Sequence, residues 1–221
     1  MEFMKLLQGR RSTRKYLPIP VEFEKIMTIM DGMKYIPSSG NLQDWKFIVV
    51  VDKEKRQIIS DCCLEQDWIA KAPVHIIVVA DVDRNRTFYG IRGERLYVIQ
   101  DSAVAATYIE LIAQDMGLGA CWVGGFDESR MKELLQIPGD NRPQVVITLG
   151  YTDEMPLEKQ SLSLYDYTFL EKYGGRIADI NEFMQWYSPR VQKAAGQGKA
   201  AAIKVFHKLI EKGKEALEKK E

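Results

Sequence analysis

The sequence predicts an α+β layered fold, and its length and its pattern of apolar segments carry this prediction. The chain has 221 residues, of which 46% are hydrophobic, which is enough for one domain with a sizeable core and an appendage. Short β-branched runs typical of strands are mixed with segments of helical periodicity. The two kinds of segment do not alternate one by one, as a doubly wound parallel sheet requires. We therefore expect helices layered on a sheet of another topology.

Two helices are expected before the first strand. Residues 2–9 form a short segment with its apolar side chains on one side. Apolar residues at helical spacing predict a longer helix over residues 21–34, with one face against the core. The expected buried stripe of this longer helix consists of Phe23, Ile26, Met27 and Met30.

Four strands are expected in the core. Residues 46–52 and 74–80 are short, continuous apolar runs, which are typical of strands buried on both faces. Residues 120–125 predict a third strand that runs into a glycine turn, and residues 143–151 predict a fourth. Shorter helices are expected over residues 53–66 and 127–136.

The strongest helical pattern covers residues 96–116. This segment is apolar nearly all round, which predicts deep burial. Its many alanines allow another helix to approach closely, so it suits either a monomer core or the centre of a dimer interface. Asp101 interrupts the apolar pattern, and we interpret it as a buried hydrogen-bonding group or a solvent-facing residue rather than a catalytic one.

The periodic pattern weakens after Pro156. We therefore predict a core domain over residues 1–156 and a C-terminal extension over residues 157–221. Residues 199–219 of the extension form a basic amphipathic pattern, which predicts a helix that packs on a partner subunit.

Charge and cysteine content narrow the function classes. The net charge is zero, yet residues 1–16 carry five cations and one anion, which favours a local anion site over a nucleic-acid surface. No apolar run approaches the roughly 20 residues that span a bilayer, and the start lacks a secretory signal, so we expect a cytoplasmic protein. The three cysteines and two histidines have no metal-site spacing, so we expect reduced thiols and no metal.

A basic segment lies close to the amino terminus. Three arginines and a serine fall within five positions, and guanidinium forks and hydroxyl groups match phosphate oxygens. The alternative is a solvated basic turn, which the spacing alone leaves open. The residues of this basic segment are Arg10, Arg11, Ser12 and Arg14.

A second polar segment, which we call the amide loop, precedes the first strand. Asn41 and Gln43 each carry a donor and an acceptor, so they complement the imide edge of a flavin ring. Ser38 and Ser39 add hydroxyl groups. A hydrogen-bonded turn before a strand is the alternative.

Gly124 and Gly125 follow the third predicted strand. Glycines let backbone N–H groups approach a flat ring closely, although a plain turn after a strand has the same composition.

Three ordered motifs together resemble the FMN-dependent nitroreductase family, over roughly residues 4 to 156. They are Arg10-Arg11-Ser12-x-Arg14-x-Tyr16, Pro37-Ser38-Ser39-x-Asn41-x-Gln43-x-Trp45 and Gly117-Leu118-Gly119-x-Cys121-Trp122-Val123-Gly124-Gly125-Phe126. The resemblance implies a mostly antiparallel central sheet flanked by helices. It also implies an intertwined homodimer with FMN at the subunit interface.

The resemblance assigns roles to residues of each motif. The four residues of the basic segment would hold the FMN phosphate and ribityl chain. Asn41 would bond the ring edge with Gln43 nearby, and Arg14 or Lys15 would stabilise negative charge on the reduced ring. No side chain is assigned as catalytic. The remaining implied contacts are Pro37, Ser38 and Ser39 toward the cofactor of the other subunit, Trp122, Val123, Gly124 and Gly125 along the ring, and Lys159 toward the phosphate.

The chain departs from the family pattern in three places. Asp44 stands where members often have proline, which we expect to be harmless. A Lys-x-Arg pair of the family is reduced to Lys159 with Ser161 in place of arginine. Gly124 replaces an acidic residue of some members, which predicts altered access to the ring.

The implied activity is ping-pong transfer of electrons from NADH or NADPH, through FMN, to nitroaromatic, quinone or related acceptors. Reductive dehalogenation and flavin fragmentation on the same fold remain alternatives, as does a flavin-binding protein without turnover. A nicotinamide dehydrogenase without flavin is disfavoured, because the glycine spacing does not match the dinucleotide fingerprint. The residues 84–96, which include Tyr89, carry a further hypothesis, that of a lid over the ring.

Overall fold

The computed structural model describes residues 2–155, 161–170 and 172–175. The chain divides into two units, Met1–Pro156 and Leu157–Glu221, and each is described by itself. The described part of the second unit contains the short helix α8 (Leu164–Tyr167). The predicted helix over 199–219 and the predicted phosphate contact Lys159 lie outside the described residues.

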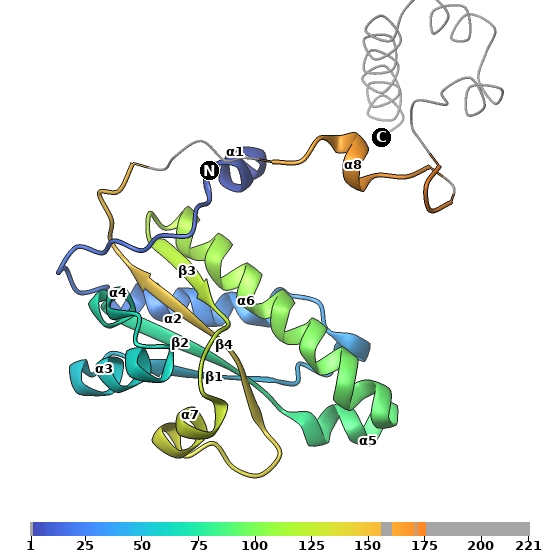
Figure 1. The fold of residues 1–221 in the computed structure, drawn as a ribbon, viewed down its shortest axis with the longest axis horizontal. Helices are drawn as coiled ribbons and strands as arrows, with labels where there is room; N and C mark the ends of the chain where they lie inside the picture. The colour runs from blue at the N-terminus through green and yellow to red at the C-terminus, as the bar shows by residue number, and fades with distance from the viewer. Residues whose placement is uncertain (1, 156–160, 171, 176–221) are drawn as a thin grey trace, which may run out of the picture. The chain divides into compact units, whose positions relative to one another are not determined.

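The first unit is built on a four-stranded antiparallel sheet, which confirms the predicted fold class (Figure 1). The strand order is β1-β2-β4-β3, so β2 and β4 lie in the middle. Every residue of β2 is buried, as its continuous apolar run predicts. The strands are β1 (Trp45–Val50), β2 (Val74–Ala80), β3 (Gly119–Val123) and β4 (Arg142–Gly150).

The prediction of a fully buried first strand is wrong. Within the described residues β1 pairs only with β2, and its Lys46 and Val49 are exposed. A run of β-branched residues reports strand propensity, whereas the position of a strand in a sheet depends on partners far away in the sequence.

Helices cover both faces of the sheet. On one face, α2 (Phe23–Gly32) and α6 (Val98–Asp115) pack on alternate β2 residues, which include Ile76 and Val78. On the other face, Ile77 and Val79 pack with α3 (Lys53–Cys62), α4 (Asp67–Lys71) and α7 (Glu128–Leu135). The sheet is therefore the middle layer of three, and β2 alternates its side chains between two apolar cores.

The predicted buried stripe of the second helix is partly wrong. Ile26 is buried, but Phe23 is 68% exposed and Met27 is 48% exposed. Ile29, one turn along from Ile26, faces the core instead. Helix α2 and the turn η1 (Met33–Tyr35) that follows it together span nearly the same residues as the predicted helix over 21–34.

The long apolar helix is confirmed as α6. Ala105, Ala106, Ile109 and Ala113 lie in the core. The helix α5 (Val82–Arg92) and the π-helical turn η3 (Gly93–Tyr97) precede it. The combined stretch Val82–Asp115 is long and apolar enough to cross a membrane, a test that the core helix of a soluble protein also passes.

Two further short elements lie near the predicted motifs. The helix α1 (Phe3–Gly9) ends directly before the basic segment, and η2 (Ser39–Asn41) is a single turn inside the amide loop.

Candidate functional site

The basic segment runs along the outer edge of β3. The Thr13 N–H donates to the Ala120 carbonyl at 2.9 Å, and Ser12 forms a parallel bridge with the same residue. The hydroxyl of Tyr16 donates to the Thr13 carbonyl at 2.8 Å. A Cβ atom at Gly119 would lie 2.6 Å from the Thr13 Oγ1, so this glycine permits the close approach.

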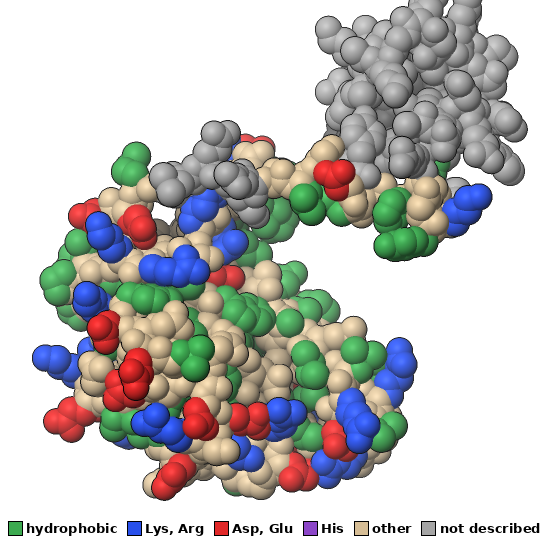
Figure 2. Space-filling view, viewed as in Figure 1, with side chains coloured by type: hydrophobic (Ala, Val, Ile, Leu, Met, Phe, Trp, Pro, Cys, Tyr) green, Lys and Arg blue, Asp and Glu red, His purple; other side chains and the backbone are tan. Residues whose placement is uncertain are grey.

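Each guanidinium of the basic segment has a different neighbour. The Arg10 Nη1 lies 3.5 Å from the Glu110 Oε1. The Arg11 Nη1 donates to the carbonyls of Gln8 and Arg10 at 2.6 and 2.9 Å, whereas the Arg14 guanidinium lies 5.7 Å from the Trp68 ring centre. In Figure 2, Lys and Arg side chains gather over this part of the chain. The arrangement gathers three guanidinium groups within five positions of the chain.

Glu110 is the buried anion beneath this cluster. It lies on α6 and is 6% exposed. Burial raises the pKa of Glu110, while the Arg10 cation and a backbone hydrogen bond from Trp122 oppose that rise. The sequence motifs do not include this residue, although it is the only charged residue between Ser102 and Ala113 and this isolation could have marked it.

The amide loop is held by the amino-terminal turn of α6. Ser39 donates to the Asp101 carboxylate from its backbone N–H, at 3.0 and 3.1 Å, and from its hydroxyl at 3.0 Å. The Gln43 N–H donates to the Ser38 Oγ at 2.9 Å. Asp101 is 5% exposed, which confirms the interpretation of a buried hydrogen-bonding group.

The amide loop has an unusual backbone. Gly40, Asn41 and Gln43 have φ angles of 54°, 55° and 50°, in the left-handed region. Asparagine adopts this region more readily than most residues, and glycine most readily of all. The Gln43 Nε2 also donates to the Asn41 Oδ1 at 3.3 Å, so the two amides lie side by side.

Helix α5 supports the same loop. The Tyr89 hydroxyl occupies the place where a Cβ atom at Gly40 would stand. Tyr89 packs edge-on against Tyr97, with ring centres 5.1 Å apart. The Arg92 Nε donates to the Tyr97 hydroxyl at 3.0 Å. The segment that carries the lid hypothesis is therefore a helix, and one of its tyrosines touches the predicted ring-binding loop.

The third motif lies at the end of β3. Trp122 is 39% exposed, and Gly124 and Gly125 are exposed as well. The Val123 side chain is buried in the core formed by α3, α4 and α7. Any contact of Val123 with a ring is thus limited to its backbone.

The basic segment and the amide loop touch opposite sides of α6. Asp101 and Glu110 are nine positions apart on this helix, which is two and a half turns and about 13.5 Å along its axis. In one chain the structure therefore brings the basic segment to the β3 motif through Ser12 and Ala120, but it does not bring the amide loop to either.

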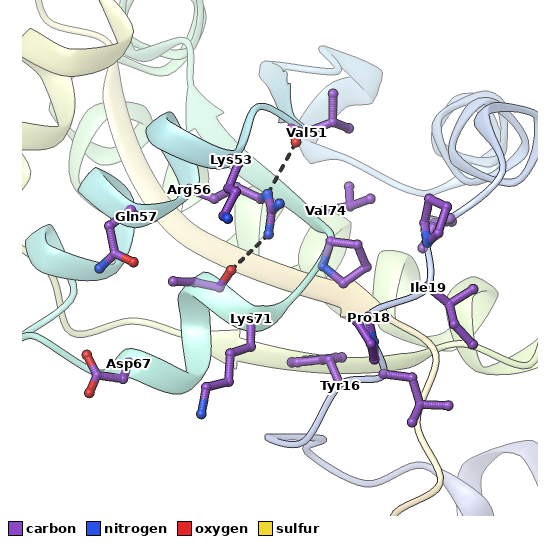
Figure 3. Close-up of a pocket in the computed structure, with 15 residues that line it drawn as sticks. Tyr16, Pro18, Ile19, Val51, Lys53, Arg56, Gln57, Asp67, Lys71 and Val74 are labelled. Atoms are coloured by element: carbon purple, nitrogen blue, oxygen red, sulfur yellow. Dashed lines mark hydrogen bonds between the residues drawn. The ribbon is translucent and has the colours of Figure 1, made fainter.

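A groove of about 830 Å³ lies elsewhere, and none of the predicted cofactor-binding residues that the structure describes lines it (Figure 3). It lies between residues 16–21, α3 and α4. Arg56 crosses its floor, where it donates to the carbonyls of Val51 and Ala70 at 3.2 and 2.8 Å. Among the described residues, no group of three or more His, Cys, Asp and Glu side chains could hold a metal ion.

The chain resembles known proteins of one family. It matches the sequence profile of the nitroreductase family over residues 7–66 and 57–151. A solved FMN-dependent nitroreductase from Clostridium difficile R20291 is 31% identical, with a TM-score of 0.66, and the match covers 76% of this chain and 99% of that one.

Two further relatives carry flavin in their names. The FMN reductase (NAD(P)H) of Bacillus subtilis is 27% identical, over 73% of this chain and 70% of the relative. The NADPH:FMN oxidoreductase of Vibrio harveyi, solved with NAD⁺, is 25% identical, with a TM-score of 0.72, over 90% of this chain and 93% of that one.

These findings confirm the predicted class of protein, an oxidoreductase that uses FMN and NADH or NADPH. The chain belongs to the nitroreductase family.

Proposed function

We propose that this chain is an FMN-dependent oxidoreductase that passes electrons from NADH or NADPH to nitroaromatic, quinone or related acceptors. The observation that carries the proposal is the basic segment fixed along the edge of β3 above Glu110. Guanidinium and hydroxyl groups gathered in one short segment suit a phosphate dianion, because charged donors form strong hydrogen bonds with phosphate oxygens.

The donor set of this chain fits FMN. Arg10, Arg11, Ser12 and Arg14 would hold the phosphate and ribityl chain, and Lys159 is a further proposed contact. Asn41 and Gln43 would meet the ring edge, with Pro37, Ser38 and Ser39 beside them. Trp122 and the exposed backbone from Val123 to Gly125 would lie along the ring. When bound, FMN supplies the hydride and electron chemistry, and the protein binds, orients and shields it.

We infer a homodimer, because the two halves of this site lie on opposite sides of α6 in one chain. The amide loop of one subunit would then complete the basic segment and β3 motif of the other. Exposed apolar side chains on α2 and α6 offer surface for such an interface. They are Phe23, Met27, Ile99 and Tyr108.

We propose that donor and acceptor bind in turn at one place, which is ping-pong turnover. The C-terminal extension, residues 157–221, would pack on the partner subunit as a second part of each protomer. All three cysteines lie in the described part of the chain and are buried and unbridged, which fits a reducing cytoplasm.

The test begins with purified protein incubated with FMN. The proposal predicts a yellow protein that anaerobic NADH or NADPH bleaches and that a nitroaromatic or a quinone reoxidises. A colourless protein that takes up no FMN would overturn the proposal. A yellow protein that NAD(P)H does not bleach would favour binding without turnover. Bleaching without reoxidation by either acceptor would favour dehalogenation or flavin fragmentation.

The phosphate assignment has its own variants. Arg10→Ala and Arg14→Ala should each weaken FMN binding by about 1.5–3 kcal/mol, the usual value of a hydrogen bond to a charged group. Lys53→Ala, an exposed lysine on α3, is the matched control for loss of one positive charge. FMN fluorescence quenching measures the affinity, and equal affinity in all three variants would contradict the assignment.

A further inference from the structure

Two buried carboxyl groups lie at the two ends of the amide loop. Asp101 holds the start of the loop through Ser39, and Asp44 directly follows its end. Asp44 is 1% exposed. Both carboxyls are part of the first unit, from α6 and from the residue before β1.

Asp44 is only half satisfied by its neighbours. The Asn85 Nδ2 on α5 donates to the Asp44 Oδ2 at 2.6 Å, and the Asp81 N–H donates to the Asp44 carbonyl at 2.7 Å. The Asp44 Oδ1, however, has no hydrogen-bond partner in the described part of the chain, which is costly for a buried oxygen.

The charges around Asp44 do not neutralise it. Neither Asp44 nor Asp101 forms an ion pair among the described residues, and Lys46, the nearby cation on β1, pairs with Asp81 at 3.5 Å. Burial raises the pKa of Asp44 to about 6, and the negative charge of Asp101 adds to that rise. The hydrogen bond between the two carboxyls also raises it, and this bond exists only when one of them carries a proton. A proton held between the two carboxyls would supply the partner that the Asp44 Oδ1 lacks.

We propose that Asp44 is a positioning residue for the flavin ring, because it shares one proton with Asp101 and this proton ties the two ends of the amide loop together. Without the proton, two carboxylates without a cation face each other in a buried site, and their repulsion spreads the loop. The sharing of the proton does not depend on the proposed function. Its effect on a flavin rests on that function.

Matched variants separate the two states of the pair. Asp44→Asn is the permanent mimic of the protonated form, because an amide keeps an acceptor for Asn85 and presents an N–H to Asp101. Asp101→Asn removes the negative charge and still accepts from Ser39. Asp31→Asn, at an exposed aspartate of α2, controls for loss of an acidic charge.

The first measurement needs no flavin. Carboxyl ¹³C NMR of the full chain should show Asp44 titrating near pH 6 in the wild type and in Asp31→Asn. In Asp101→Asn the titration should move toward the ordinary value for aspartate, about 3.9. An Asp44 that titrates near its ordinary value in the wild type, or at the same pH in Asp101→Asn, would overturn the shared proton.

The second measurement is FMN affinity at pH 5.5 and pH 8. The FMN phosphate gains charge over this range, so the informative quantity is the affinity of Asp44→Asn relative to the wild type at each pH. We expect a ratio near one at pH 5.5 and on the order of tenfold at pH 8, the equivalent of one pKa unit. A ratio that does not change with pH would overturn the positioning role.

The outcomes distinguish this proposal from the proposed function. If the protein binds no FMN but the titration shows the shared proton, the proposed function and the flavin-positioning role are both wrong and only the carboxyl pair is supported. If FMN binds normally and the ratio does not change with pH, the proposed function is supported and the positioning role is wrong. If Asp44→Asn does not fold, the wild-type titration and Asp101→Asn still decide whether the proton is shared.

Discussion

The basic segment and the amide loop rest on the same helix but are held in opposite ways. Above Glu110, the basic segment carries cations around one buried anion, and its backbone is fixed to β3. Beside Asp101, the amide loop has two buried acids and no ion pair among the described residues. One helix therefore supports both a region with a buried ion pair and a region with two buried acids.

Loss of the Arg10–Glu110 ion pair should have the largest effect on the free energy of unfolding. Glu110→Ala removes the one ion-pair partner that Arg10 has among the described residues and a buried side chain of α6, so we expect a loss of about 3–5 kcal/mol. Glu110→Gln keeps the size of the side chain and should lose less. Urea unfolding of both variants measures the difference, and equal losses would show that the charge does not matter.

The second region should respond to pH in the opposite sense from an ion pair. Because the folded pKa of Asp44 is above its unfolded value, the folded state binds more protons between about pH 4 and pH 6. Wild-type stability should therefore fall as pH rises through this window, by up to about 3 kcal/mol. Asp44→Asn should lack this part of the fall, so its advantage in unfolding free energy should be absent below pH 4 and largest above pH 7. A constant difference between the two proteins would contradict this expectation.

A smaller effect should separate the backbone of the amide loop from its charges. Gly40→Ala places a side chain at positive φ and against the Tyr89 hydroxyl, so we expect a loss of about 1–3 kcal/mol. Tyr89→Phe removes the hydroxyl and should recover part of that loss in the double variant. A double-mutant cycle measured by urea unfolding tests the contact, and strictly additive losses would argue against it.

The smallest predicted effect concerns salt. Raising ionic strength should weaken FMN binding through the partly exposed basic segment, because salt screens charges that water reaches. The pH-dependent ratio between Asp44→Asn and the wild type should change little, since the acid pair is buried. FMN titrations in about 0.05 and 0.5 M salt measure both the affinity and this ratio. If salt changed the two equally, the difference between the basic segment and the buried acids would be contradicted.

Local sequence patterns predicted most of the helices and strands, because such patterns report the secondary-structure propensity of a segment. The buried run of β2, the helix α6 and the antiparallel sheet were all predictable, the last through the family resemblance. The edge position of β1 was not, since it depends on strand pairing across the chain. Phe23 and Ile26 share helical spacing, and only the packing of α2 on α6 decides which of them is buried.

The motifs of the candidate site were predictable from the sequence, but the residues that hold these motifs in place were not. Arg10 and Ser39 are named by their motifs, whereas Glu110 and Asp101 contact them across 100 and 62 positions of sequence. Asp44 was expected to be a harmless replacement of proline. Its burial next to a second acid follows only from how α5 and α6 meet the loop.

The pairing of Ser12 and Thr13 with Ala120 has a consequence for solubility. Ser12 and Thr13 act as a strip that covers part of the hydrogen-bonding edge of β3. Proteolytic removal of this strip would leave unpaired N–H and C=O groups on that edge, and bare edges of this kind template aggregation. Cleavage near the amino terminus should therefore cause precipitation even of protein prepared without flavin.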